Sequence, residues 1–308
     1  MDDQLLNALQ IRYIKLHFTI SFIEDAALPV HKVSAIRGGM GEMLLRANCI
    51  RDRECDCCDF ESECIVRRTM YSKSAIKPDY VTNWESIGYV LECENDQTYF
   101  PKGGTLSFNL ILFGEAIVYF NQYLQALSAL GMHGIGSFHA KFVIISIKNT
   151  CLKELLEGNN IVMKNYQVQT ISSYVAYRMK KITESERTLV FQTPATLKYN
   201  GEFLQKFRMD VILGAIRRRI YMLDCFEGID NDFYHDYQTP VPEVSFQQEK
   251  YVKVCRYSSR QGRMFLRGIT GFVQMKEVYP ETLPLLLAGE LVHIGKNTSF
   301  GFGHYRMK

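Results

Sequence analysis

Three groups of side chains in this sequence have types and spacings that could carry chemistry, and the first is a cluster of cysteines. Five of the nine cysteines fall in one short segment, CIRDRECDCCDFESEC (residues 49–64). Cys49, Cys55, Cys58 and Cys64 have the spacing C-x5-C-x2-C-x5-C. A central C-x2-C is typical of zinc sites, and four thiolates can close a tetrahedral site. We therefore expect a zinc ion here, with Cys57 as a spare thiol or a substitute for Cys58.

The cysteine segment has two other interpretations, a reduced loop without metal and an iron–sulfur cluster, which also takes four thiolates. Its neighbouring side chains are acidic, so the segment is a poor phosphate binder: Asp52, Glu54, Asp56, Asp59, Glu61 and Glu63. Any zinc is therefore expected to be structural and to hold an insertion that has little core of its own.

The second group is a glycine-rich segment, HIGKNTSFGFGHYRMK, near the C-terminus. Gly295, Gly301 and Gly303 allow positive φ and close approach of a ligand, because they carry no Cβ. Exposed N–H groups in such a turn form an anion-binding concavity, and Lys296 adds a charge suited to phosphate. The alternative is a bulge that only closes a sheet. The segment has neither a Walker lysine–serine pair nor a GxGxxG before a helix, which excludes the common nucleotide-binding loops.

The third group is the seven histidines, whose ordinary pKa near neutrality suits acid–base chemistry. They are His17, His31, His133, His139, His235, His293 and His304. No catalytic motif surrounds His31. His31 precedes an expected helix, and His293 stands two residues before Gly295.

Arginines form local clusters although the whole chain is nearly neutral, with 36 basic and 33 acidic residues and a net charge of +3. Arg37 and Arg46 lie on one expected helix, and Arg217–Arg219 on another. The third cluster is interleaved with Tyr257 and Phe265, a pattern suited to phosphate contacts with base stacking, and comprises Arg256, Arg260, Arg263 and Arg267. A solvated charged face is the alternative for each cluster.

Length and composition limit the class of protein. A chain of 308 residues with 47% hydrophobic content can form one large or two ordinary domains. The N-terminal MDDQLLNALQ lacks a signal-peptide pattern, and no apolar run reaches the roughly 18–20 residues of a membrane span. We expect a cytoplasmic protein without a membrane partner, in which the cysteines form no disulfide framework.

The elements that must position these groups repeat in two halves. The first half has expected strands at 11–23, 88–92, 105–112 and 141–147, and expected helices at 34–47 and 115–130, the latter ending at Gly131. The second has expected strands at 187–198, 251–256, 263–273 and 290–307, and expected helices at 202–224 and 280–288. Each half has the order β-α-β-β-α-β. We predict an α+β fold of tandem ferredoxin-like domains, 1–136 with the cysteine insert and 137–308 with the glycine loop.

Several segments resemble one family. LLLAGELVHIGKNTSFGFGHYRM (285–307) resembles the C-terminal signature of the RAMP superfamily, in the branch of precursor-CRISPR-RNA processing endoribonucleases. Four further segments are similar to that branch in the same order: IRGGMGEMLLRANCI (36–50), LGMHGIGSFHAKF (130–142), VFQTPATLKYNG (190–201) and RYSSRQ…LRGITG (256–271). The resemblance covers roughly residues 10–308, and some members of the branch carry a similar cysteine-rich insert.

The resemblance implies an antiviral-defence endoribonuclease that binds CRISPR repeat RNA and cuts precursor transcripts once per repeat. The implied chemistry needs no metal: the 2′-hydroxyl attacks the adjacent phosphate and leaves a 2′,3′-cyclic phosphate. His31 is the first candidate for the catalytic histidine, His293 the second, and Lys296 would stabilise the charge on the phosphate.

By the same resemblance, the RNA would contact the arginines of the first helix and of the third cluster, and the glycine loop. The residues are Arg37, Arg46, Arg256, Arg260, Arg263, Arg267, Gly295, Lys296, Asn297, Thr298, Ser299, Gly301 and Gly303. Other CRISPR effector or adaptation proteins are expected partners.

Two other functions stay open. One is a subunit of the same superfamily that holds the RNA in an effector complex without cutting it. The other, from a different class, is a regulatory protein built on a metal cluster in the cysteine segment, which leaves the glycine loop unexplained.

Overall fold

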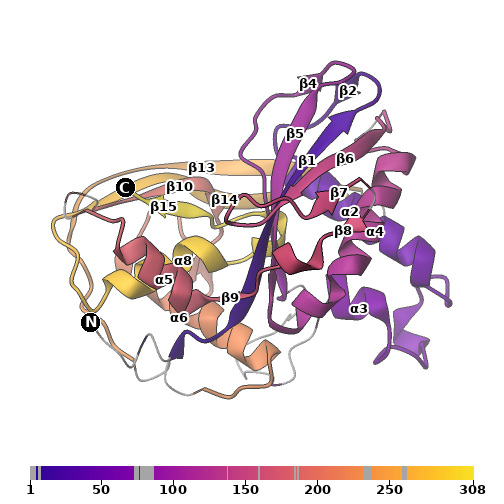
Figure 1. The fold of residues 1–308 in the computed structure, drawn as a ribbon. Helices are drawn as coiled ribbons and strands as arrows, with labels where there is room; N and C mark the ends of the chain where they lie inside the picture. The colour runs from indigo at the N-terminus through magenta and orange to yellow at the C-terminus, as the bar shows by residue number, and fades with distance from the viewer. Residues whose placement is uncertain are drawn as a thin grey trace. The chain divides into compact units, whose positions relative to one another are not determined.

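The structure is a computed structural model that describes Leu5 and residues 8–72, 76, 87–136, 138–158, 160–183, 185, 187–231, 237–258 and 262–308. The chain divides into two compact units. The N-terminal unit is Tyr13–Val168, and the C-terminal unit is Met1–Arg12 together with Gln169–Lys308. Each unit is built on its own antiparallel sheet (Figure 1).

The sheet of the N-terminal unit has the order β3-β5-β1-β6, with β3 (Tyr89–Glu92), β5 (Thr105–Phe113), β1 (Arg12–Phe22) and β6 (Phe142–Lys148). Side chains of β1 alternate between buried and half-buried along most of its length, as expected for a strand that covers a core with one face. Within that core the rings of Phe18 and Phe108 stack at 5.3 Å.

Two helices of the N-terminal unit pack against each other, α2 (Val33–Asn48) and α4 (Phe120–His133). Helix α2 buries Val33, Ile36, Met40 and Leu44, which recur every three or four residues and so lie along one stripe. Helix α4 runs past Gly131 and ends at His133, with Gly134 as its C-cap, so the expected end at Gly131 was wrong. Gly131 serves another purpose, because a Cβ there would lie 2.4 Å from the backbone oxygen of Phe142 in β6.

Shorter elements complete the N-terminal unit. They are β2 (Ala26–Ala27), η1 (Cys55–Cys57), α3 (Ile65–Met70), β4 (Tyr99–Phe100), η2 (Gly114–Tyr119), β7 (Leu156–Glu157), β8 (Asn160–Ile161) and η3 (Met163–Asn165). The cysteine segment lies between α2 and α3 and lacks a strand or long helix of its own. It is an insert in the first ferredoxin-like unit, as the sequence predicts.

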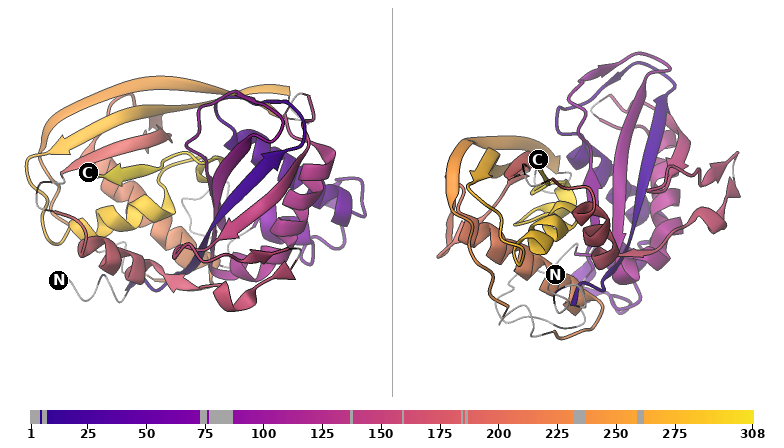
Figure 2. Two further views of the ribbon diagram at one scale, coloured as in Figure 1. Left: turned by 45° about the horizontal axis from the view of Figure 1, so that its top comes forward. Right: turned by 60° about the vertical axis from the view of Figure 1, so that its left-hand side comes forward.

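The sheet of the C-terminal unit has the order β13-β14-β10-β15, with β13 (Val244–Ser258), β14 (Gly262–Met275), β10 (Thr188–Ala195) and β15 (Tyr305–Met307). Strands β13 and β14 form a long curved hairpin (Figure 2). The core of this unit includes the stacked rings of Phe191 and Phe207, 4.4 Å apart.

The remaining elements of the C-terminal unit are β9 (Gln169–Thr170), α5 (Ile171–Met179), β11 (Lys198–Tyr199), β12 (Glu202–Phe203), α6 (Met209–Phe226), α8 (Leu283–Val292) and η4 (Thr298–Phe300). The helix expected over 202–224 begins only at Met209. Its expected first residues form β12, which pairs with β11 in a hairpin, because Asn200 and Gly201 take positive φ and turn the chain back. The strand expected over 290–307 is the end of α8, the glycine loop and the short β15.

Both units have the strand order of a ferredoxin-like fold, in which the first strand lies between the third and the fourth. The predicted α+β fold of tandem ferredoxin-like domains with a cysteine-rich insert is confirmed. The expected boundary between 136 and 137 differs from the observed division, because β6 pairs with β1 and so belongs to the first sheet. Among the described residues, no helix is both long and apolar enough to cross a membrane.

Candidate functional site

The glycine loop, residues 293–304, follows the end of α8 and depends on backbone conformations that favour glycine. Gly295, Gly301 and Gly303 have φ of 79°, 77° and 75°, and the non-glycine residues His293 and Asn297 have φ of 58° and 66°. A Cβ on Gly303 would lie 1.9 Å from the oxygen of Ile294, so only glycine fits there.

Hydrogen bonds inside the protein occupy many of the loop's backbone N–H groups. Lys296 N–H donates to Thr196 O (3.0 Å), Gly301 N–H to Thr298 O (2.8 Å) and Gly303 N–H to Pro194 O (2.9 Å). The N–H groups of Phe300 and Phe302 donate to Asn297 O. These five donors close the loop on itself and on the segment at the end of β10, so they do not form the anion-binding concavity expected from the sequence.

The side chains of the loop differ in their access to solvent. Thr298 and Ser299 are buried, at 8% and 7% exposure, which disfavours direct contact of their hydroxyls with a ligand. Asn297 is half-buried and donates from Nδ2 to Thr196 Oγ1 (3.4 Å). Lys296 is exposed. Partial burial, followed by the nearby charges of Lys198 and Arg218, lowers the pKa of Lys296.

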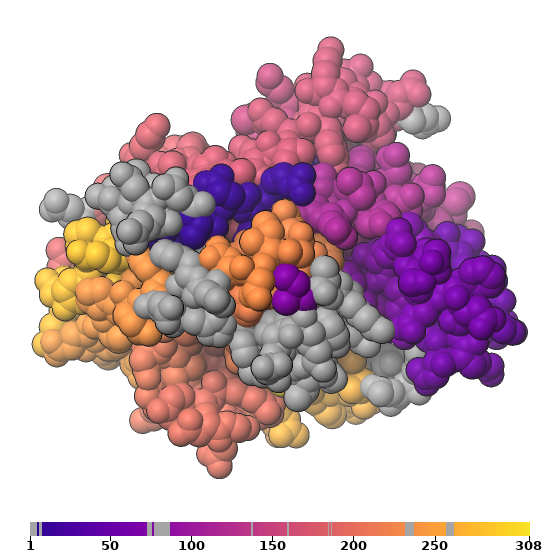
Figure 3. All heavy atoms as spheres, turned by 90° about the horizontal axis from the view of Figure 1, so that it is seen from below, coloured from indigo at the N-terminus to yellow at the C-terminus, as the bar shows by residue number. Residues whose placement is uncertain are grey.

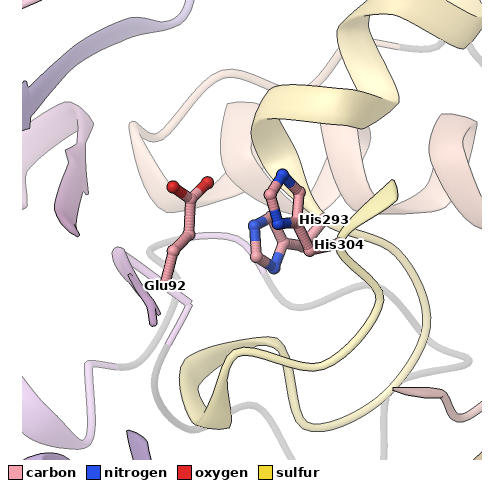
Figure 4. A group of neighbouring side chains, drawn as sticks. All are labelled: Glu92, His293 and His304. Carbon is pink, nitrogen blue, oxygen red and sulfur yellow. The ribbon is translucent and has the colours of Figure 1, made fainter. Parts of the chain in front are cut away.

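His293 and His304 form a buried pair at the two ends of the loop. Their rings are parallel, with centroids 4.7 Å apart (Figure 4). His293 is fully buried and contacts Phe302 O through Nδ1 at 3.1 Å. Of the two roles that the sequence leaves open for His293, this position favours ordering the loop over catalysis. The sequence alone assigns no role to His304, because nothing in the spacing of the two histidines shows that their rings stack.

Figure 4 also draws Glu92, a residue of the N-terminal unit. Its carboxylate binds Lys15 Nζ at 2.6 Å and accepts a hydrogen bond from Asn109 Nδ2 at 2.7 Å. Within its own unit Glu92 therefore joins β3, β1 and β5.

The β13–β14 hairpin supports the glycine loop through one of its faces. Val254 and Leu266 are cross-strand partners that form a buried cluster with Phe302, against which Phe300 packs. On the same face, the guanidinium of Arg256 lies 4.6 Å from the centre of the Phe300 ring. Arg256 thus holds an aromatic residue of the loop.

The other arginines of this hairpin project from the opposite face. Cys255 pairs with Phe265 and Lys253 with Arg267, out of phase with the Val254–Leu266 pair. Arg263 and Arg267 are both exposed, and Arg263 lies 5.3 Å from the ring of Phe265, itself 49% exposed. The cluster expected from the sequence is therefore divided between two faces. Arg260 lies outside the described residues.

The three arginines of α6 point to three environments, as helical geometry requires. Arg217 donates from Nη1 to Tyr237 O at 2.6 Å, and Arg218 is exposed. Arg219 is buried and donates from Nε to Val292 O at 3.1 Å. Burial lowers the pKa of Arg219 to about 10. It binds the end of α8, where the glycine loop begins.

The candidate residues of the N-terminal unit lie on or next to α2. His31 is exposed, two residues before the helix. Partial burial of its ring and the charge of Lys32 lower its pKa, against the opposing effect of Asp96. Arg37 and Arg46 are nine positions apart, which places them on opposite faces of α2. Arg46 binds Glu42 at 2.9 Å.

The cysteine segment contains the turn of the C-x2-C pair, but among the described residues no three of its thiols lie within 4.8 Å of one another. Cys58 N–H donates to Cys55 O (3.2 Å) and closes the tight turn of the C-x2-C pair. Cys49, Cys55, Cys58 and Cys64 are all half-buried, whereas Cys57 is exposed. Cys49 Sγ also accepts a hydrogen bond from Arg53 N–H (3.2 Å). In the space-filling view this purple segment lies at the surface (Figure 3).

Comparison with known proteins gives two family matches that together cover most of the chain. The AF_1859_N family, described as an N-terminal domain, matches residues 9–173. The family described as CRISPR-associated endoribonuclease Cas6 matches residues 189–305. An uncharacterized protein of Archaeoglobus fulgidus is 24% identical over 292 residues, which are 91% of this chain and 93% of that protein.

Solved structures show the same fold at low sequence identity. A chain of a partial Cas6-RT-Cas1–Cas2 complex matches 97% of this chain with a TM-score of 0.58 and 11% identity. This chain spans 46% of the length of that one. A Cas6 product complex matches 96% of this chain and 99% of its own, with a TM-score of 0.50 and 16% identity.

Proposed function

The chain belongs to the AF_1859_N family over residues 9–173 and matches the Cas6 endoribonuclease family over residues 189–305, and on this premise we propose that it is a Cas6-type protein that binds CRISPR repeat RNA and cleaves precursor transcripts once per repeat. The observation that carries the proposal is Lys296, an exposed cation on a glycine loop that is fixed by hydrogen bonds to the segment at the end of β10. Such a loop can place a positive charge against an RNA phosphate in a defined position.

The proposed chemistry is attack of the 2′-hydroxyl on the adjacent phosphate. His31, at the surface and with a lowered pKa, removes the proton of the 2′-hydroxyl. Lys296 stabilises the negative charge that develops on the phosphate oxygens. The bond from phosphorus to the 5′-oxygen breaks, that oxygen takes up a proton from water, and the products end in a 2′,3′-cyclic phosphate and a 5′-hydroxyl. No step requires a metal ion.

The experiment is incubation of the protein with repeat RNA in excess EDTA, followed by analysis of the product ends. A single cut per repeat with a cyclic phosphate supports the proposal. Loss of cleavage in EDTA, restored by a divalent cation, would contradict the metal-independent chemistry. A 3′-hydroxyl end would contradict attack by the 2′-hydroxyl.

A second candidate function is an RNA-holding subunit that does not cut. The burial of His293 favours it, because it leaves only His31 of the two candidate catalytic histidines at the surface. Tight binding of repeat RNA without any cut, in EDTA and in magnesium alike, would support this function over the first.

Two further proposals concern partners and metal. One structural neighbour is a chain of a Cas6-RT-Cas1–Cas2 complex, which supports adaptation proteins as partners of this chain beside the repeat RNA. We also propose a structural zinc ion held by Cys49, Cys55, Cys58 and Cys64. The shared half-burial of these four thiols, against the exposure of Cys57, supports this ligand set.

A further inference from the structure

A small hairpin next to the glycine loop has no role in the function proposed above. Strands β11 and β12 pair Lys198 with Phe203 and Tyr199 with Glu202, and the turn between them is Asn200–Gly201. Both turn residues have positive φ, 49° and 83°, as a type I′ turn requires. Such a turn matches the twist of the two strands and holds the hairpin in one conformation.

The base of this hairpin is joined to the glycine loop. Thr196 and Lys296 form an isolated antiparallel bridge, with Lys296 N–H donating to Thr196 O at 3.0 Å. Gly295 permits this approach, because a Cβ there would lie 2.5 Å from the oxygen of Thr196. The hairpin and the loop are therefore fixed relative to each other within the C-terminal unit.

One face of the hairpin combines an aromatic ring with cations. Thr196 and Lys296 are bridge partners, so their side chains project to the same side. Lys198 lies two residues after Thr196 in an extended chain, so it projects to that side as well. Lys198 Nζ lies 4.5 Å from the centre of the Phe203 ring, and Phe203 is still 46% exposed. The charges of Lys198 and Arg218 both act on Lys296, so the cation beside this ring belongs to a local group of three positive charges.

The opposite face of the hairpin has an aromatic residue, Tyr199, and the cation beside it is already neutralised by an ion pair. The guanidinium of Arg208 lies 4.1 Å from the centre of the Tyr199 ring, and it also binds Asp210 at 2.5 Å. Tyr199 is 43% exposed, close to the exposure of Phe203. The two aromatic residues are thus matched in exposure and in hairpin position but differ in the charge beside them.

We propose that Phe203, Lys198, Lys296 and Arg218 form a subsite for one nucleotide of single-stranded RNA next to the segment bound at the glycine loop. Its base stacks on the exposed part of the Phe203 ring, and its phosphate pairs with Lys198 and Arg218, while Lys296 contacts the neighbouring phosphate of the segment at the glycine loop. Aromatic rings beside basic side chains bind single strands of any sequence in this way. The inference rests on the proposed function, since it assigns a further part of the same RNA.

The test compares the RNA affinities of Phe203→Ala and Tyr199→Ala, using repeat RNA with single-stranded flanks. A parallel series uses the same RNA with one abasic nucleotide, placed at each flanking position in turn. Phe203→Ala should weaken binding by roughly 5- to 150-fold, the effect of losing one base–aromatic stack. Tyr199→Ala should change the affinity by less than about twofold. At one abasic position the loss caused by Phe203→Ala should disappear.

Each outcome decides between the claims. Equal affinity of Phe203→Ala and the wild type, with the wild type binding repeat RNA, would overturn the subsite and leave the proposed function intact. Equal weakening by both variants, at every abasic position, would show that the hairpin matters only for the fold of the loop and would also overturn the subsite. Failure of the wild-type protein to bind repeat RNA would contradict the proposed function itself.

Discussion

His31 lies at the surface, and partial burial of its ring lowers its pKa below the ordinary value of 6.5, so it is neutral and able to accept a proton at neutral pH. We predict that His31→Ala lowers the single-turnover cleavage rate by about 10²- to 10⁴-fold, the usual contribution of a general base, without weakening RNA binding. Cleavage by the wild type should stay on a plateau as the pH falls through 6.5 and decline only below the lowered pKa.

The companion variant is His293→Ala, which should reduce the affinity for RNA through disorder of the glycine loop, since His293 is buried against Phe302 and His304. Full cleavage rates in both variants would refute the assignment of either histidine. A loss of rate that occurs only in His293→Ala, at saturating RNA, would move the catalytic role away from His31.

Glu290 is a buried carboxylate that joins three parts of the C-terminal unit. It binds Arg178 at 2.8 Å, accepts a hydrogen bond from Tyr174 (2.9 Å) and accepts one from Met307 N–H in β15 (2.7 Å). We predict that Glu290→Ala lowers the free energy of unfolding by about 3–5 kcal/mol, because it leaves the Arg178 charge without its partner. Urea denaturation of this variant beside Glu290→Gln, which keeps an acceptor oxygen, measures the effect. A loss below about 1 kcal/mol in both variants would contradict the prediction.

At the residue scale the sequence predicts the composition of the site better than its orientation. Lys296 is exposed on a glycine loop, as expected, but Thr298 and Ser299 are buried. Arg256 and Arg263 lie on opposite faces of one hairpin. The sequence does not predict this, because the face of each residue depends on the strand register, and the spacing of the two arginines across an unknown turn does not reveal that register. His304 was missed because its stacking on His293 is a tertiary contact.

Among the elements, α2 and α4 offer a matched pair of glycines. Gly38 in α2 is exposed and a Cβ there would meet nothing within 4 Å, whereas at Gly131 in α4 it would meet the backbone of β6. We predict that Gly38→Ala raises the free energy of unfolding by about 0.5–1 kcal/mol, since alanine has the higher helix propensity. Gly131→Ala should lower it by about 1–3 kcal/mol. Chemical denaturation curves that shift in the same direction for both variants would contradict these expectations.

The cysteine insert gives a prediction that depends on metal content. The purified protein should contain about one zinc ion per chain, and Cys58→Ser should lose it, because zinc takes four ligands in structural sites. Cys57→Ser is the control and should retain the metal, since Cys57 is exposed. Elemental analysis decides, and limited proteolysis should cut the insert faster in Cys58→Ser than in Cys57→Ser. Equal metal content in the two variants, or iron instead of zinc, would contradict the proposed site.

The element order could be predicted because hydrophobic periodicity marks strands and helices in both halves. The errors lie where short-range turns override periodicity. The Asn200–Gly201 turn converts the expected start of α6 into a hairpin, and the loop glycines interrupt the expected last strand. Both errors lie close to the Thr196–Lys296 bridge, where residues with positive φ, and not hydrophobic periodicity, direct the chain.

At the scale of the whole molecule, the net charge of +3 is too small for general attraction to RNA. Binding should instead depend on local cations and therefore on salt. We predict that the logarithm of the affinity for single-stranded RNA falls linearly with the logarithm of salt concentration. Lys296→Gln should reduce that slope by about 0.7, the contribution of one phosphate contact on a single strand. An unchanged slope in this variant would exclude a direct contact between Lys296 and phosphate.

The family and the tandem fold could be predicted from five segments in sequence order. The division of the chain could not be predicted. It depends on β6, which joins the first sheet by pairing with β1, a strand far earlier in the chain. Such long-range pairing is decided by packing of whole sheets, and no local pattern around residue 136 reports it.

Strand β13 stands at the end of its sheet, with β14 on only one side of it. A long strand in this position offers a row of backbone groups to any other extended chain and is a common starting point of aggregation. Lys250 and Lys253 are exposed along it, so a second copy laid against this edge would bring lysines close to one another. We therefore expect the charges on β13 to oppose aggregation, and substitutions that remove them for RNA-binding assays should be tested first by light scattering.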